Sequence, residues 1–367
     1  MTDPRIETWA RALVGYSAPV RSGQTVGITG GVAAEPLLRA VYREVLRLGA
    51  HPVLVPSFPE LRADLLAMGA DEQLGFVSPI ERFLREGVDV IVTVMAETNT
   101  KALSGVDPSR SILWQRARTD LMRTSMRRSA EGTLQWTLTL WPTDAYAQDA
   151  EMASDDFAEF VFRACKLDQP DPAAAWRQQA TEQQRLIDWL HGKREIRLRG
   201  PDTDLRLSVA DRTWVNADGT KNFPDGEVFT GPVEAATEGY VRFSFPVVTQ
   251  GREVEDVRLR FEGGKVVDAS AAKNEAFLVQ TLDTDPGARI LGELAFGTNF
   301  GIDRFSKNIL FDEKIGGTVH MAIGAGYPET GNTNESAVHW DLICDLRQGG
   351  SVEVDGEPFL VDGRYLV

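Results

Sequence analysis

The sequence predicts two domains, an N-terminal α/β domain with a parallel sheet and flanking helices, followed by a β-rich α+β domain. Apolar strand-like runs alternate with helix-spaced patterns over residues 1–191, whereas apolar and polar residues alternate between Gly, Asp and Asn turns over 192–367. The chain has 367 residues, and a single hydrophobic core stops growing at about 250 to 300 residues. We therefore place one domain boundary near His191.

The first strand, helix and strand are expected at residues 24–29, 32–48 and 52–55, the second strand being buried. Apolar residues recur with helical spacing in the middle segment, and Gly49 ends that helix. Two strands joined by a helix of this length imply a crossover connection. The N-terminal sheet is therefore predicted to be parallel.

The same alternation continues to residue 190. Helices are expected at 61–74, 108–129, 155–165 and 173–190, and strands at 88–95 and 133–141. Pro170 and Pro172 precede the last helix, which we interpret as the connector between the domains. We interpret the arginines of the helix at 108–129 as a solvated face; they are Arg110, Arg116, Arg118, Arg123, Arg127 and Arg128.

Composition excludes several classes of protein. Lys and Arg number 39 and Asp and Glu number 54, giving a formal net charge of −15 that repels nucleic acid. The two cysteines, Cys165 and Cys344, form no CxxC pair, so neither a disulfide framework nor a thiolate zinc site is expected. Charges near the N-terminus and the lack of a long apolar stretch predict no signal peptide and no membrane span. We expect a cytoplasmic protein.

Common catalytic and nucleotide-binding motifs are absent. Gly27, Gly30 and Gly31 follow a strand, but their spacing is not G-x-G-x-x-G, and we interpret them as a strand-to-helix turn. The sequence contains no P-loop, no H-E-x-x-H and no G-x-S-x-G. The chemistry must therefore be sought in residues that are distant in the sequence.

Two of the four histidines, His320 and His339, lie close together in the C-terminal third. In the strand-like segment 336–345, apolar residues alternate with His339 and Asp341, which places these two side chains on one face. His320 belongs to a second strand-like segment, and a glycine-rich loop carrying Tyr327 follows it. These residues could ligate a metal; the alternative is that His339 and Asp341 only hydrogen-bond each other.

Glu227 and Glu293 each follow a glycine and are flanked by apolar residues. A carboxylate buried among apolar groups is unfavourable unless it is paired or binds a cation. Both glutamates are therefore candidate metal ligands. Taken singly, each would also suit a turn or the protein surface.

In these residues the sequence resembles the M29 metallo-aminopeptidases, the thermophilic aminopeptidase T group. The resemblance covers most of the chain, from the Gly27-Ile-Thr-Gly segment to the C-terminal Phe359-Leu-Val-Asp-Gly-Arg-Tyr, and includes the segments around Trp141, Glu227 and His339. It implies an α/β domain followed by a β-rich catalytic domain, and a homodimer whose N-terminal domains help to enclose the site. It also implies removal of N-terminal residues from peptides with a free N-terminus.

The resemblance implies two divalent metal ions, Zn, Co or Mn, that activate a shared water. Their ligands would be Glu227, Glu293, His320, Tyr327, His339 and Asp341. Glu227, Glu293 and Tyr327 would also serve catalysis, with one of the two glutamates as general base. The segment between Tyr327 and His339 is shorter than is usual in the family, so substrate preference does not transfer.

Two other functions remain open from the sequence. The same metals could serve a metal-dependent amidase with non-peptide substrates. Alternatively, the metals could stabilise a non-catalytic binding protein.

Overall fold

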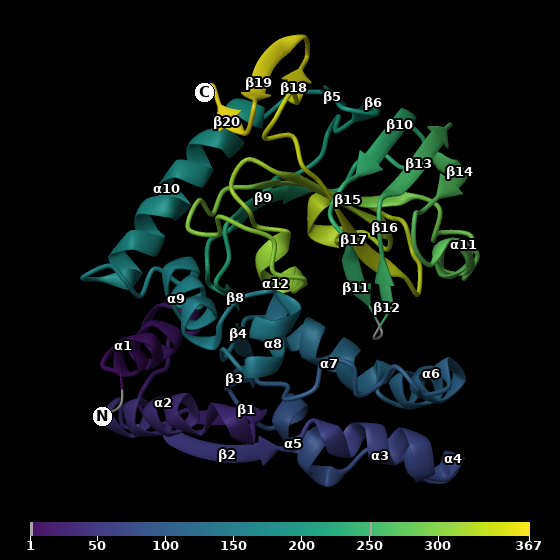
Figure 1. Cartoon of the computed structure of the whole chain (residues 1–367). Coiled ribbons are helices and arrows are strands. Elements are labelled where there is room, and N and C mark those ends of the chain that lie inside the picture. Colours follow the sequence, from purple (N-terminus) through teal and green to yellow (C-terminus); the bar gives the residue numbers. More distant parts are fainter. Residues whose placement is uncertain (1–2, 250–251) are drawn as a thin grey trace. The chain divides into compact units, whose positions relative to one another are not determined.

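The computed structural model describes residues 3–249 and 252–367, which divide into two compact units (Figure 1). The first unit comprises Met1–Ala175 and Gly219–Pro224, and the second comprises Trp176–Asp218 and Asp225–Val367. The division falls inside helix α10 (Pro172–Leu190). No helix among the described residues is both long enough and apolar enough to span a membrane.

The first unit contains a five-stranded sheet in the order β2-β1-β3-β4-β8, with every neighbouring pair parallel. Its strands are β1 (Thr25–Gly31), β2 (His51–Ser57), β3 (Val90–Met95), β4 (Gln135–Leu140) and β8 (Asn222–Phe223). The α/β class with a parallel sheet is therefore confirmed. The prediction that the second strand is buried is wrong, because β2 is an edge strand with no buried side chain.

Nine α-helices of the first unit lie before α10 in the described chain. They are α1 (Arg5–Ala12), α2 (Glu35–Arg47), α3 (Glu60–Met68), α4 (Asp71–Gly75), α5 (Pro79–Glu86), α6 (Pro108–Ala117), α7 (Thr119–Ala130), α8 (Asp144–Asp149) and α9 (Ser154–Ala164). The helix expected at 61–74 is interrupted at Gly69, whose backbone is extended, and the helix expected at 108–129 is interrupted at Arg118. Helix α5 was not predicted; Ser78 caps it by accepting a hydrogen bond from the Glu81 amide.

The interpretation of the arginine helix as a solvated face is wrong for three of its six arginines. Arg110 donates hydrogen bonds to the carbonyls of Leu66 and Gly69 at the end of α3. Arg128 donates to the carbonyls of Arg85 and Val88, at 2.9 and 2.8 Å. The last carbonyls of a helix have no partner within the helix, and a guanidinium can satisfy several of them.

Arg118 joins α4, α5 and α6, and its loss is expected to destabilise the first unit. Its guanidinium donates to the carbonyls of Leu74 and Phe76 at 3.2 and 3.0 Å, and forms an ion pair with Glu81 at 2.8 Å. We expect Arg118→Ala to lower the free energy of unfolding by about 1 to 3 kcal/mol, because it leaves several partners unpaired. Urea unfolding would measure this, with exposed Arg116→Ala as the control. A change below about 0.5 kcal/mol, the usual range for a surface substitution, would contradict it.

The second unit is β-rich, as predicted. One sheet has the order β14-β13-β10-β6-β5-β18-β19-β20, a second has the order β17-β16-β15-β9-β7, and β11 pairs with β12. The strands are β5 (Glu195–Gly200), β6 (Thr203–Ser208), β7 (Val215–Ala217), β9 (Glu227–Thr230), β10 (Glu238–Phe243), β11 (Val247–Thr249), β12 (Arg252–Val254), β13 (Val257–Glu262), β14 (Lys265–Ser270), β15 (Leu291–Gly297), β16 (Val319–Gly324), β17 (His339–Cys344), β18 (Ser351–Val354), β19 (Glu357–Val361) and β20 (Arg364–Tyr365).

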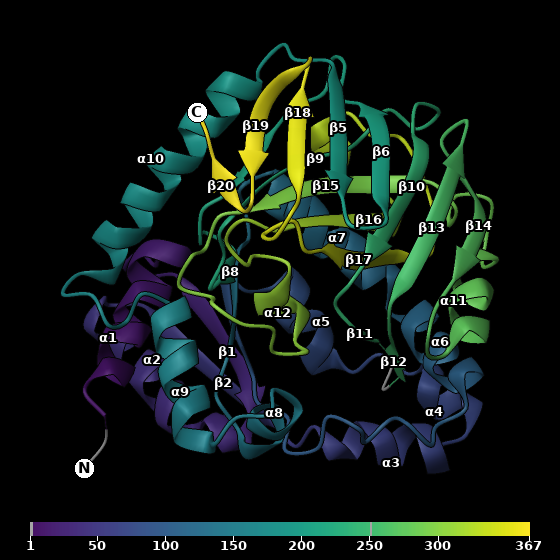
Figure 2. The same ribbon diagram turned by 45° about the horizontal axis from the view of Figure 1, so that its top comes forward.

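Both large sheets of the second unit contribute to one hydrophobic core. Strands β15 to β17 cross the strands of the eight-stranded sheet (Figure 2). Leu198 and Val241 of the larger sheet are buried in the same cluster as Leu294, Met321 and Leu342 of the smaller one. Helices α11 (Glu275–Leu282) and α12 (Ile309–Asp312) also belong to this unit. The apolar face of the sheet β17-β16-β15-β9-β7 thus packs into this core.

Candidate metal centre

Most of the candidate ligands lie on the polar face of the sheet β17-β16-β15-β9-β7 in the second unit. In an antiparallel pair, directly opposite residues point to the same side of the sheet. Opposite residues are Gly297 and Glu227 in β15 and β9, and Ala295 and His320 in β15 and β16. Ala322 of β16 lies opposite both Glu293 and Asp341, and Gly324 lies opposite His339. Five of the six predicted ligands therefore share one face.

The residues directly opposite these ligands on the neighbouring strands are alanines and glycines. Their small size leaves room for the polar side chains. A Cβ added to Gly297 would lie 2.1 Å from the carbonyl oxygen of Ile315. Gly324 has φ +98°, which other residues rarely adopt. The other face carries Leu294, Phe296 and Met321, which belong to the core. The period-two alternation of β15 and β16 therefore separates core from site.

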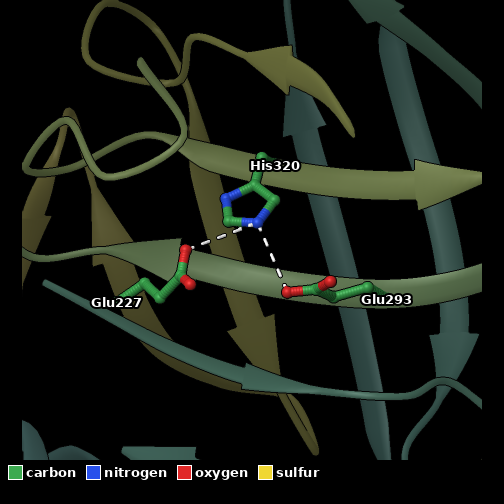
Figure 3. A group of neighbouring side chains, drawn as sticks. All are labelled: Glu227, Glu293 and His320. Atoms are coloured by element: carbon green, nitrogen blue, oxygen red, sulfur yellow. Dashed lines mark ion pairs between the residues drawn. The ribbon is translucent and has the colours of Figure 1, made fainter. Parts of the chain in front are cut away.

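His320 lies between two glutamates. Its Nε2 atom is 3.5 Å from Glu227 Oε2 and 3.4 Å from Glu293 Oε1 (Figure 3). Its Nδ1 atom lies 2.8 Å from the carbonyl oxygen of Glu313, which can only accept a hydrogen bond. Nδ1 therefore carries a proton, which leaves Nε2 as the atom that would bind a cation when the ring is neutral.

His339 repeats this arrangement on the neighbouring strand. Its Nε2 atom is 3.4 Å from Glu293 Oε2 and 3.5 Å from Asp341 Oδ1. Its Nδ1 atom donates to the Ala325 carbonyl at 2.8 Å. The two oxygens of Glu293 thus face different histidines, as expected of a carboxylate that bridges two cations.

These side chains fit divalent cations. Two ligand atoms that each lie about 2.1 Å from a tetrahedrally coordinated ion are about 3.4 Å apart, close to the observed 3.4 to 3.5 Å. The buried Oε2 atom of Glu227 has no hydrogen-bond partner among the described residues. Glu227 and Glu293 are only 7% and 4% exposed, so the charge of their carboxylates is poorly compensated by solvent.

The negative potential of the cluster shows in the pKa values of its histidines. Burial lowers the pKa of His320, but the hydrogen bond to Glu293 and the charge of Glu227 outweigh it and raise the pKa to about 10. Burial likewise opposes the rise at His339, where hydrogen bonds to Asp341 and Glu293 bring the pKa to about 11. Burial raises the pKa of Glu227 well above its usual range. The carboxylates therefore strongly favour a positive charge at the positions of the two histidines, whether a proton or a metal ion carries it.

Tyr327, the sixth predicted ligand, lies beside His339 in the loop after β16. Its ring centroid is 5.1 Å from that of His339 and 5.4 Å from that of Phe229. Burial raises the pKa of its hydroxyl, and the charges of Glu293 and Asp341 raise it further. The phenol is therefore within the electrostatic influence of the same cluster.

Glu313 is a candidate site residue that the sequence did not indicate. Its carboxylate groups with His320 and Asp341, with one ligand atom of each within 4.8 Å of the others. Burial raises its pKa, and the neighbouring ammonium of Lys314 opposes that rise. Glu313 follows α12 in a run of three charged residues, Asp312-Glu313-Lys314, which resembles an ordinary surface turn in sequence.

Comparison with known proteins identifies the family. Residues 2–365 match the family described as thermophilic metalloprotease (M29). The chain belongs to the M29 family. Aminopeptidase T of Thermus aquaticus is 33% identical to this M29 chain over 298 residues, which cover 72% of this chain and 71% of that protein. Aminopeptidase T of Thermus thermophilus is 29% identical over 401 residues, covering 98% and 94% of the two chains.

The fold of this M29 protein is also similar to that of a solved structure. Wild-type AmpT from Thermus thermophilus superposes with a TM-score of 0.86 and 27% sequence identity, over 99% of both chains. The predicted family is thereby confirmed, and so is the prediction of an enzyme of the metallo-aminopeptidase class. The ligand set and the number of metal ions stay predictions.

Proposed function

We propose that the protein is a dinuclear metal-dependent aminopeptidase that hydrolyses the N-terminal peptide bond of unblocked peptides. The observation that carries this proposal is the position of Glu293, whose Oε1 and Oε2 each lie 3.4 Å from the Nε2 atom of a different histidine. Glu227 and His320 would hold one ion, His339 and Asp341 the other, and Glu293 both. Neutral imidazoles favour Zn, Co or Mn over Mg or Ca.

The charge of the cluster supports two divalent ions. The charge of Lys314 acts on four buried or partly buried carboxylates, those of Asp225, Glu227, Glu313 and Asp341, and Glu293 lies between the two histidines. The carboxylates outnumber the ammonium, and two divalent cations would compensate more of their negative charge than one.

Two bound ions would lower the pKa of a shared water toward about 7 and polarise the scissile carbonyl. We assign the general base to Glu313 in place of Glu227 or Glu293, because those two lie on either side of His320 and would be engaged as ligands. Glu313 would accept the proton of the water and pass it to the leaving amine. The Tyr327 hydroxyl, held protonated by its raised pKa, can donate a hydrogen bond to the carbonyl oxygen under attack.

Chelation tests the proposal. We expect EDTA to abolish cleavage of aminoacyl anilides, and Zn, Co or Mn to restore it with two ions bound per chain, measured by elemental analysis. N-acetylated peptides are expected to resist cleavage. Cleavage of the acetylated peptides as fast as the free ones would instead favour an amidase. A folded protein with bound metal but no activity under any of the three metals would favour the non-catalytic binding protein.

The family resemblance supports a homodimer and a cytoplasmic enzyme that meets peptides with a free N-terminus. Sedimentation of the purified protein would test the homodimer, since a monomer at micromolar concentration would contradict it.

A further inference from the structure

Lys314 is a buried lysine within the candidate metal centre. It lies between α12 and β16, and its side chain is 0% exposed. Its backbone is fixed by two hydrogen bonds, from its amide to the Phe311 carbonyl and from the Asn299 amide to its own carbonyl, each 3.0 Å long. Removing an ammonium from water costs several kcal/mol, so fully buried lysines are rare and need negatively charged partners.

The partners of Lys314 are the carboxylates on one side of the cluster. Its Nζ atom contacts the Glu313 carboxylate directly. Its charge also acts on Glu227 and on Asp225, which is 3% exposed. The Glu313 carboxylate therefore lies between the Lys314 ammonium on one side and the side chains of His320 and Asp341 on the other.

We propose that Lys314 is a positioning residue, a buried cation of the protein that offsets part of the negative charge around the metal centre and holds Glu313 in place as general base. This inference rests on the proposed function. Without the Lys314 ammonium, Glu313 loses its direct contact and the buried carboxylates lose a compensating charge.

A simpler role for Lys314 would be to neutralise Asp225. The double variant Asp225→Asn/Lys314→Met separates the two roles, because it removes one positive and one negative charge while nearly preserving volume. Asn at 225 can still accept the hydrogen bond that the Gly226 amide donates to Asp225 Oδ1 at 3.1 Å. The single variants Lys314→Met and Lys314→Arg complete the set.

The experiment measures bound metal per chain, melting temperature, kcat and KM for the wild-type protein and each variant, loaded with Zn or Co. We expect the double variant to fold and bind two ions, with KM within about threefold of wild type. Its kcat should fall about 100-fold, the loss expected when a catalytic group is misplaced by about 1 Å. Lys314→Arg, which keeps the charge, should recover part of kcat.

Three results would overturn the inference. Wild-type kcat in the double variant would mean that Lys314 only neutralises Asp225. Loss of folding or of bound metal in the double variant would mean that Lys314 supports the fold or the ligands. Wild-type kcat in Lys314→Met would mean that the ammonium is dispensable. The wild-type protein tests the proposed function separately, since cleavage of unblocked peptides with two ions bound upholds it whatever these variants do.

Discussion

Replacing Glu293 with alanine is expected to abolish peptide hydrolysis, with a fall in kcat/KM of about 1000-fold or more, because several kcal/mol of metal-dependent transition-state stabilisation would be lost. Glu293 is the one carboxylate whose two oxygens face both histidines, at 3.4 Å each. Its loss should therefore weaken both metal positions together, whereas loss of Glu227 should weaken mainly the position at His320.

Elemental analysis after gel filtration and a steady-state assay with an aminoacyl anilide would measure both effects. Glu293→Gln keeps the volume of the buried side chain and shows whether a cavity, rather than the lost charge, is responsible. Glu335→Ala, which removes an exposed glutamate of the same unit, serves as the control and should change neither value. Two tightly bound ions and full activity in Glu293→Ala would contradict the proposed metal centre.

Alternation along single strands could be predicted from the sequence. The segment 336–345 shows that His339 and Asp341 share a face, and the structure places their Nε2 and Oδ1 atoms 3.5 Å apart. The pairing of β9 with β15 and of β15 with β16 could not be predicted in this way, because it joins residues more than sixty and more than twenty positions apart. For these strands, the family resemblance indicates which residues are ligands, and the pairing itself comes only from the structure.

For charged residues outside the strands, the sequence pattern does not indicate which side chains are buried or paired. Glu313 and Lys314 follow a four-residue helix, and nothing in their spacing indicates that Lys314 is buried. The arginines of α6 and α7 show the same limit, since their spacing does not distinguish exposed Arg123 from Arg128, which donates to carbonyls at the end of α5. Burial of a charge depends on partners that are distant in the sequence.

Replacing Glu313 with glutamine is expected to lower kcat by about 100- to 10,000-fold, the usual contribution of a general base. Glutamine has nearly the same shape and can still accept a hydrogen bond from Lys314, but its amide cannot take up the proton of the attacking water. The Glu313 carbonyl that holds His320 Nδ1 at 2.8 Å is part of the backbone and is unaffected. Both metal ions should therefore stay bound while turnover is lost.

Retained metal with lost turnover would distinguish a general base from a metal ligand at Glu313. Metal content and kcat would be measured on the same preparation, together with Glu329→Gln, an exposed glutamate in the loop of Tyr327 that should leave both unchanged. Loss of one ion in Glu313→Gln would make Glu313 a metal ligand, in keeping with its group with His320 and Asp341. Full turnover would return the role of base to Glu227 or Glu293, and the contact between Lys314 and Glu313 would then have no part in catalysis.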